Sequence, residues 1–313
     1  MATGGNTVES KLPAELPLDF LKKITNDFSD ERLLGTGAFG SVYKGILEDG
    51  GVIAVKRLGE NSPVPSEKIF ANEVQNMMVL KNENIVKMVG FCRETHKKLV
   101  TIGNRHINAN ITETVLCYEY FQKGSLDKHI FDESTTVDWE VRFKIIKGIS
   151  KGLQFLHNLP RPLRHLGLKP QNILLDDNMA PKIADFGFSR IFDQGQTRMK
   201  TGSVVGTVGY MAPEYMYHGE ISNRSDIYSL GLIILEITTR EKNSSSTDQK
   251  HAREYIQGVT ENWNLEQIMV KYPELDADGI SQVENCIRIG LQCVDIDQES
   301  RPTINEIVNM LNS

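Results

Sequence analysis

The pattern of apolar and polar positions changes character along the chain. Short runs rich in β-branched and aromatic residues come first, and residues 32–34, 41–47 and 52–56 are typical of strands. Asp49-Gly50-Gly51 separates the last two and is a hairpin signal. Residues 115–120 form a further short apolar run. This part of the chain therefore predicts a small β-sheet.

Helical periodicity takes over after Gly124. Apolar residues recur at steps of three and four across residues 139–156, which predicts one face of a long amphipathic helix. Residues 227–237 are apolar nearly all round and predict a helix buried in the middle of a lobe. Pro302 is expected to open a last helix. Within the earlier strand region, residues 67–80 also show helical spacing.

Two segments lie outside this pattern. Residues 1–27 are polar, and we expect an extension with one short helix near residues 20–24. Its start lacks the charged-then-apolar pattern of a secretory signal. Residues 96–114 are longer than a tight hairpin needs, and we interpret them as a tolerated surface insertion. A partner-binding loop is the alternative for that insertion.

Composition narrows the function classes. The chain has 313 residues, of which 40% are hydrophobic and 24% charged, as in an ordinary soluble protein. The net charge is −6, so the chain lacks the basic surplus expected of a protein that binds nucleic acid or an anionic membrane. No apolar run approaches the roughly 20 residues of a membrane helix. Four scattered cysteines lack disulfide or metal spacing and indicate free thiols in a reducing compartment.

The first chemical motif is the run Gly35-Thr36-Gly37-Ala38-Phe39-Gly40. A strand follows it, so these glycines belong to a hairpin tip and not to a dinucleotide-binding turn. Glycine lets backbone amides approach phosphate groups closely. Lys56, on the next strand, is then predicted to be a phosphate ligand. Glu73, on the helix that follows, could pair with Lys56 and hold it extended.

A second motif lies near the middle of the chain. The stretch from His165 to Asn172 reads HLGLKPQN, and Asp185-Phe186-Gly187 begins 13 residues after Asn172. An aspartate after a short strand can bind Mg²⁺, which prefers oxygen ligands. Ala212-Pro213-Glu214 closes the segment that Asp185 opens. All these parts occur in one order and at compatible spacings.

Taken together, the motifs resemble a eukaryotic protein kinase domain. Lys169-Pro170 and Gly206-Thr207-Val208-Gly209-Tyr210 are similar to the serine/threonine class. The stretches NDFSDERLLGTGAFGSVYKG, GSLDKHIF, KPQNILLD and GTVGYMAPEY resemble the plant receptor-like kinases of the Pelle group. The implied fold class is α+β and two-lobed. It has a small antiparallel β-sheet N-lobe with one helix, a large and mainly helical C-lobe, and ATP in the cleft between them.

The resemblance also implies domain boundaries and site residues. Residues 1–27 become a juxtamembrane-like extension and 28–313 the kinase domain, with N-lobe 28–117, hinge 118–123 and C-lobe 124–313. Asp226 would brace the catalytic loop, and Glu214 would pair with Arg301. The implied catalytic residues are Lys56, Glu73, Lys169, Asn172 and Asp185, of which Asn172 and Asp185 would bind Mg²⁺. The implied ATP-binding residues are Leu34, Gly35, Gly37, Phe39, Gly40, Val42, Ala54, Lys56, Tyr118, Glu119, Phe121 and Leu174.

Gly167 departs from the family pattern H-R-D-x-x-x-x-N. It occupies the position of the aspartate that accepts the proton of the substrate hydroxyl, and Leu166 occupies that of the arginine. Three hypotheses follow: an ATP- and Mg²⁺-binding kinase-like scaffold with weak or no phosphotransfer, an active serine/threonine kinase, and a purely structural protein. The first is favoured because the carboxylate is missing and the other ATP and metal contacts are present.

The expected partners are ATP and a protein substrate or protein partner, with no nucleic acid and no direct membrane insertion. The resemblance also suggests membrane receptor kinases as proteins with which the chain associates. The expected location is cytoplasmic, with the inner face of the plasma membrane reached through partners. A complete cytosolic chain and a receptor fragment both remain open.

Overall fold

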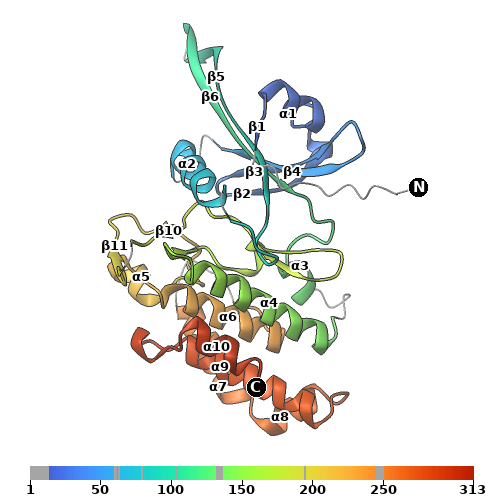
Figure 1. Ribbon diagram of the computed structural model, residues 1–313, viewed down its shortest axis with the longest axis vertical. Coiled ribbons are helices and arrows are strands. Elements are labelled where there is room, and N and C mark those ends of the chain that lie inside the picture. Colours follow the sequence, from blue (N-terminus) through green and yellow to red (C-terminus); the bar gives the residue numbers. More distant parts are fainter. Residues whose placement is uncertain are drawn as a thin grey trace, which may run out of the picture. The chain divides into compact units, whose positions relative to one another are not determined.

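The computed structural model describes residues 14–59, 62, 64–78, 80–102, 105–131, 137–193, 195–243 and 250–313. The chain divides into two compact units. Unit 1 contains the described residues up to Leu80 together with Lys87–Tyr120, and unit 2 contains Lys81–Val86 and Phe121–Ser313. The α+β fold class is confirmed, because unit 1 is built on a sheet and unit 2 is mainly helical (Figure 1).

A six-stranded sheet in the order β1-β5-β6-β4-β3-β2 forms unit 1. All neighbouring strands run antiparallel except the short β1, which pairs parallel with β5. Helix α2 follows β4. The bounds are β1 Ala14–Glu15, β2 Leu33–Gly37, β3 Gly40–Ile46, β4 Val52–Leu58, α2 Ser66–Met77, β5 Met88–Ile102 and β6 Arg105–Glu119, with a 3₁₀ turn at Asp30–Arg32.

Residues 96–114, which we interpreted as a surface insertion, extend a hairpin of two paired strands. Strands β5 and β6 each run for 15 residues, so these residues lengthen a hairpin. Beyond the stretches that pair with β1 and β4, the two strands pair only with each other in the described part of unit 1. Cross-strand contacts such as the 2.9 Å hydrogen bond between Thr95 and Thr112 support the ribbon. It projects from the rest of the sheet (Figure 1).

The N-terminal segment is built into the core of unit 1. The predicted short helix is present as α1, Leu18–Thr25. Its buried residues Leu18, Leu21 and Ile24 pack in one apolar cluster with Val55 of β4 and with residues of β5 and β6. Glu94 accepts a hydrogen bond from the Leu18 amide at 2.6 Å, which satisfies one of the free N–H groups at the start of the helix.

Unit 2 is organised around helix α6, Ser225–Thr239, in which every residue is buried. The predicted amphipathic helix is present as α4, Trp139–His157, and packs against α6 and α10. Pro302 lies before the last helix, which begins after Thr303 with a capping box to Glu306. The other helices are α3 Asp127–Ile130, α5 Pro213–His218, α7 Lys250–Asn262, α8 Leu265–Lys271, α9 Ala277–Cys293 and α10 Ile304–Met310.

Short strand pairs and 3₁₀ turns complete unit 2, and they include the candidate site residues Asn172 and Leu174. The pairs are β7 with β10, β8 with β9, and β11 with β12, all antiparallel. Their bounds are β7 Leu163–Arg164, β8 Ile173–Leu175, β9 Pro181–Ile183, β10 Arg190–Ile191, β11 Arg198–Lys200 and β12 Glu220–Ser222, with 3₁₀ turns at Pro170–Asn172 and Gln298–Ser300.

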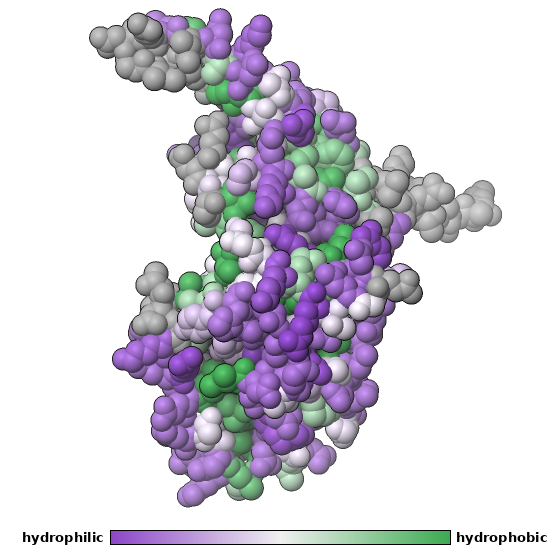
Figure 2. All heavy atoms as spheres, turned by 90° about the vertical axis from the view of Figure 1, so that its left-hand side faces the viewer, coloured by the Kyte–Doolittle hydropathy of each residue, from purple (hydrophilic) through white to green (hydrophobic). Residues whose placement is uncertain are grey.

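The face of the molecule drawn in Figure 2 is mostly hydrophilic, and apolar residues gather there only in small, separate patches. In the described part of the chain, no helix has the length and apolar character needed to cross a membrane. All four cysteines are buried free thiols, as predicted.

Candidate functional site

The glycine-rich run forms the tip of the β2–β3 hairpin, as predicted. Gly37 and Gly40 are paired across the tip. Gly40 has a φ of +140°, and a Cβ atom there would lie 2.1 Å from the carbonyl oxygen of Arg57, so only glycine fits. A Cβ atom at Gly35 or Gly37 would have no neighbouring atom within 4 Å, so the backbone there is open to a close-approaching group. Such a tip can present amide N–H groups to phosphate oxygens.

Lys56 and Glu73 meet inside unit 1. The Lys56 ammonium lies 3.5 Å from Oε2 of Glu73, and the Glu73 side chain is fully buried. Tyr118, on the strand next to β4, donates its hydroxyl to the other carboxylate oxygen of Glu73 at 2.5 Å. Both oxygens of a buried carboxylate are thereby engaged, which holds Lys56 in a defined position beside the sheet.

The predicted wall residues of unit 1 cluster around Lys56 in the sheet register. Val42 is the direct neighbour of Lys56 on β3, and Ala54 is the direct neighbour of Tyr118 on β6. Leu34 is 40% exposed on β2, as expected of an apolar side chain left available to a ligand. Phe39 lies at the hairpin tip, and its carbonyl oxygen accepts the Gly59 amide.

Glu119 and Phe121 follow Tyr118 where the chain leaves unit 1. The amide of Glu119 donates to the carbonyl oxygen of Lys87 at 3.1 Å, so this N–H is already used. Its carboxylate accepts the Lys87 amide at 2.7 Å. These two bonds fix the position of Glu119 at the end of β6. Phe121 belongs to unit 2, as does Leu174 on β8.

Asp226 organises the central loop of unit 2. Its fully buried carboxylate accepts the backbone amides of His165 and Leu166, each at 2.8 Å, and Nε2 of His157 at 3.0 Å. Burial alone would raise the pKa of Asp226. The hydrogen bond from His157 and the other donors outweigh burial, and they hold that pKa below its usual range. The predicted bracing role is therefore confirmed by geometry.

His165 forms the inner wall of the same loop. Its Nδ1 accepts the Gly167 amide at 3.1 Å, so the ring proton is on Nε2, which donates to the Ala184 carbonyl at 3.0 Å. Burial lowers the pKa of His165 despite the opposing charges of Asp226 and Asp185, which keeps the ring neutral. The ring also packs edge-on against Phe186, with 4.8 Å between centroids.

Gly167 sits in a backbone position that would accept a side chain. A Cβ atom there would lie 3.5 Å from the His165 ring and 3.7 Å from Nδ2 of Asn172, which are ordinary contact distances. The carbonyl oxygen of Gly167 accepts Nδ2 of Asn172 at 2.7 Å. The loop is therefore held by backbone groups, and no carboxylate is presented at this position.

Asn172 and Asp185 are the predicted metal ligands. Because Nδ2 of Asn172 is used by Gly167, its Oδ1 is left as an acceptor. Asp185 has a φ of +71°, a conformation that is uncommon for residues other than glycine. Among the described residues, no group of three or more His, Cys, Asp or Glu side chains is placed to hold a metal. These two oxygen donors suit Mg²⁺ bound mainly through substrate phosphates and water.

Two further contacts lie beside the loop. Lys169 donates to the hydroxyl of Thr207 at 3.0 Å, which ties the catalytic-loop motif to the segment before Ala212. Glu214 and Arg301 form a two-pronged ion pair with both N–O distances at 2.8 Å, which confirms the predicted pairing. Leu166 is buried, with a φ of +60°.

Sequence reasoning missed the contacts of two buried glutamates. It did not find the bond from Tyr118 to Glu73, because the two residues are 45 positions apart. It also missed Glu236 of α6, whose carboxylate accepts the Tyr210 hydroxyl and the Asn243 amide. A charged residue in the otherwise apolar run 227–237 was the available signal for the second contact.

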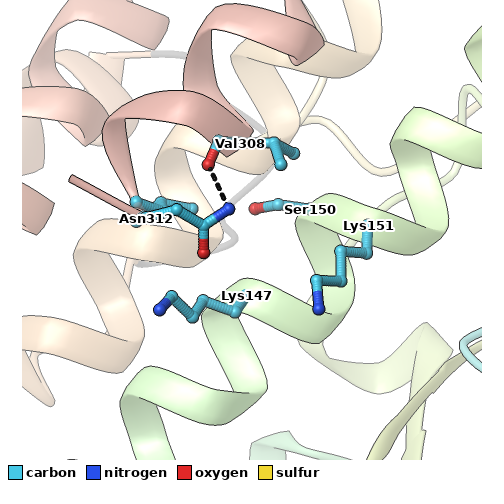
Figure 3. A pocket seen from close by; sticks show the side chains of 6 residues that line it. Lys147, Ser150, Lys151, Val308 and Asn312 are labelled. Atoms are coloured by element: carbon cyan, nitrogen blue, oxygen red, sulfur yellow. Dashed lines mark hydrogen bonds between the residues drawn. The ribbon is translucent and has the colours of Figure 1, made fainter.

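A shallow recess lies between α4 and α10. Lys147 and Lys151 of α4 face Val308 of α10 and Asn312, which follows α10, across it, and Asn312 donates to the Val308 carbonyl at 2.9 Å (Figure 3). The volume inside it that a water molecule could occupy is about 0 Å³. This recess has no room for a ligand.

Known proteins are similar to this chain in sequence. Residues 28–311 match the family model described as protein kinase domain. Cysteine-rich receptor-like protein kinase 41 of Arabidopsis thaliana is 40% identical over 307 residues, which cover 96% of this chain and 44% of that protein. Kinase 36 of the same series is 43% identical over 295 residues, covering 92% of this chain and 41% of that protein. For kinase 44 the identity is 39%, covering 96% of this chain and 76% of that protein.

The chain spans less than half the length of the first two of these relatives. The family model, by contrast, covers nearly all of this chain, and it begins at Phe28, after helix α1. The chain therefore belongs to the protein kinase family, among the serine/threonine receptor-like kinases of plants.

Proposed function

We propose that this chain binds ATP with Mg²⁺ and transfers phosphate weakly or not at all, so that it signals mainly through protein contacts. The observation that carries the proposal is Gly167, which offers no carboxylate where a protein kinase holds its catalytic base. A general base typically contributes about 10²- to 10⁴-fold to a rate. The residues expected to contact ATP and Mg²⁺ are present, and this favours nucleotide binding.

The residues of unit 1 fit the nucleotide part of the proposal. The open glycines of the hairpin tip would accept phosphate oxygens, and Lys56, held by Glu73, would supply a positive charge to them. By the resemblance to protein kinases, the apolar residues Leu34, Val42, Ala54 and Leu174 would contact the adenine. Tyr118, Glu119 and Phe121 would border it, with backbone groups of the last two as hydrogen-bonding partners.

The residues of unit 2 fit the metal part. Oδ1 of Asn172 and the carboxylate of Asp185 are the oxygen donors, and both would bind Mg²⁺ together with phosphate oxygens. When bound, Mg²⁺ neutralises charge on the transferred phosphoryl group. Lys169, held at Thr207, would contribute a further positive charge close to the acceptor hydroxyl.

An active serine/threonine kinase is the second candidate. The catalytic loop keeps its backbone architecture without the aspartate, since Asp226, His165 and Asn172 hold it through main-chain groups. Phosphoryl transfer depends mostly on positioning and charge neutralisation. On this second candidate, the intact scaffold would give measurable turnover even without the base.

Phosphotransfer by the purified chain decides between the two candidates. We expect Mg²⁺–ATP autophosphorylation of the wild type to match that of Lys56→Met, and Gly167→Asp to exceed both by about 10²- to 10⁴-fold. Gly167→Asn is the matched control, because it has the same size without a basic carboxylate. Wild-type turnover clearly above Lys56→Met would reject the scaffold proposal in favour of the enzyme.

Nucleotide binding is tested separately. A ligand at 100 times its Kd stabilises the folded state by about 2.7 kcal/mol. We expect Mg²⁺–ATP to raise the Tm of the wild type and of Gly167→Asp alike. Asp185→Asn is expected to lose the dependence of that shift on Mg²⁺. No shift for the wild type at millimolar Mg²⁺–ATP would reject nucleotide binding.

The proposed partners are a protein substrate or binding protein and, by the resemblance to receptor-like kinases, membrane receptor kinases. Through such partners the chain would act in the cytoplasm at the inner face of the plasma membrane. Co-purification of the tagged chain with membranes in the presence of a receptor kinase, and its release when that receptor is absent, would support this location.

A further inference from the structure

A cavity of about 310 Å³ lies in unit 2, away from the residues discussed above. It is bordered by the start of α4, the end of α6 and the segment from Trp263 to Glu274 that contains α8. The residues that give it its chemistry are Trp139, Arg142, Arg240, Trp263, Lys271 and Tyr272. The volume is at the lower end of the range for small-molecule sites, about 300 to 1,000 Å³.

Aromatic rings make up much of the wall. The Tyr272 ring lies edge-on to Trp139 at 5.7 Å and to Trp263 at 6.5 Å between centroids. All three side chains are at least 95% buried. Their polar atoms are already bonded: the indoles donate to Gln282 and Glu241, and the phenol donates to Thr238. The rings can therefore offer a ligand mainly apolar and π surface.

Arg142 is a buried cation in this wall. It is 7% exposed, and its guanidinium lies over the rings of Trp139 at 5.6 Å and Tyr272 at 5.1 Å. Its Nη1 donates to the Ile237 carbonyl and the Tyr272 hydroxyl. Its Nε is buried without a hydrogen-bond partner, and within the described ranges no carboxylate lies within ion-pair distance of it.

A buried charge without a counter-ion is costly unless another group compensates it. Cation–π contacts to two rings compensate Arg142 only in part. The other charged residues of the wall are the cations Arg240 and Lys271 and the carboxylates Asp138 and Glu274, so the lining as a whole carries one net positive charge. Lys271 is further offset by Glu241, 3.4 Å away. The cation that most needs an anion is therefore Arg142.

We propose that this cavity binds a small organic anion with a flat apolar body, such as an aromatic carboxylate. The anionic group would accept hydrogen bonds from Arg142, and the flat body would pack against the aromatic wall. The volume limits the body to one or two rings. Nothing in this assignment depends on nucleotide or phosphotransfer, since the lining shares no residue with the proposed ATP and Mg²⁺ contacts.

The chain carries its own reporter for the site. It contains two tryptophans, Trp139 and Trp263, and both line the cavity. Tryptophan fluorescence of the whole protein therefore reports on this cavity. The probe is 4-iodobenzoate, whose iodine quenches an indole on contact, and 4-iodobenzamide is the neutral control of nearly equal shape.

We expect 4-iodobenzoate to quench the fluorescence saturably, with an affinity about tenfold or more above that of the amide. Lys56→Met should bind it as the wild type does. Arg142→Gln should weaken binding by about tenfold or more, whereas Arg288→Gln, which removes an exposed arginine of α9, should leave it unchanged.

Three results would overturn the proposal. They are quenching that does not saturate, equal affinity for acid and amide, and unchanged affinity in folded Arg142→Gln. The comparison of acid with amide uses only the wild-type chain. It therefore decides the question even if Arg142→Gln does not fold.

Discussion

The side-chain amide of Asn172 donates to the carbonyl oxygen of Gly167 at 2.7 Å. The backbone at position 167 is thus anchored from one side by Asn172 and from the other by the ring of His165. Neither bond involves a side chain at 167. The loop can therefore keep its shape while lacking the carboxylate that protein kinases use, and this separation of shape from chemistry underlies the first prediction.

Replacing Gly167 by alanine is expected to leave the fold intact and to stabilise it by about 0.4–1 kcal/mol, because the unfolded chain loses freedom while the native backbone accepts a Cβ atom. Gly40→Ala is the contrasting variant, since its Cβ atom would collide with the Arg57 carbonyl and its φ is positive. Urea unfolding measures both. A destabilised Gly167→Ala would mean that the loop needs glycine for conformational reasons.

Tyr118→Phe should lower the free energy of unfolding by about 1–3 kcal/mol, because one oxygen of the buried Glu73 carboxylate loses its hydrogen-bond donor. Tyr43→Phe provides the matched control in the same unit, since no hydrogen bond of the Tyr43 hydroxyl is found in the structure's described residues. Chemical denaturation of the two variants makes the comparison. Equal effects would show that the Tyr118 hydroxyl contributes nothing specific.

Glu236 should make stability depend on pH. Burial raises the pKa of Glu236 to about 8, against the hydrogen bonds from Tyr210 and Asn243, which lower it. Between its unfolded pKa near 4.5 and the folded value, the folded state holds a proton that the unfolded state has released. The contribution of Glu236 to stability is therefore present at low pH and is lost as pH rises through this window.

Glu236→Gln removes that titration. Its stability relative to the wild type should rise with pH between about 4.5 and 8, by at most about 1.4 kcal/mol per pH unit, and level off above. Unfolding curves at several pH values measure the slope. Glu284→Gln, at an exposed position of α9, should show no such trend. A pH-independent difference for Glu236→Gln would contradict the assignment.

Leu21→Ala should cost about 2–5 kcal/mol, because Leu21 is fully buried in the cluster that joins α1 to the sheet of unit 1. Lys23→Ala, two residues away on an exposed face of the same helix, should change stability little. If both variants unfold like the wild type in denaturant, helix α1 contributes nothing to the stability of unit 1.

Local pattern was enough to locate most elements. The apolar run 227–237 and the periodic run 139–156 predicted α6 and α4, because burial on all sides or on one face leaves a direct trace in residue order. Asp49-Gly50-Gly51 predicted its turn, where Gly50 adopts a φ of +85°. Motif spacing likewise placed Lys56 on the strand after the glycine hairpin.

Contacts between distant residues could not be read in the same way. Residues 107–112 alternate between apolar and polar residues, a strand signal that the sequence analysis did not use. Their pairing into a long ribbon, however, depends on cross-strand partners such as Thr95 and Thr112. The polar segment before Phe28 contains an eight-residue helix whose apolar face has meaning only once β4, β5 and β6 supply a surface for it. Burial of Arg142 without a carboxylate is equally invisible in residue order.

The sequence by itself determined the family, the order of the motifs and the absence of a carboxylate at Gly167, since these depend only on which residues are present and how they are spaced. Tertiary structure alone decided that Asp226, His165 and Asn172 hold the loop through backbone groups, and that Glu73 is shared between Lys56 and Tyr118. The physical reason is that hydrogen bonds and burial depend on distances between atoms, and folding sets those distances between residues far apart in the chain.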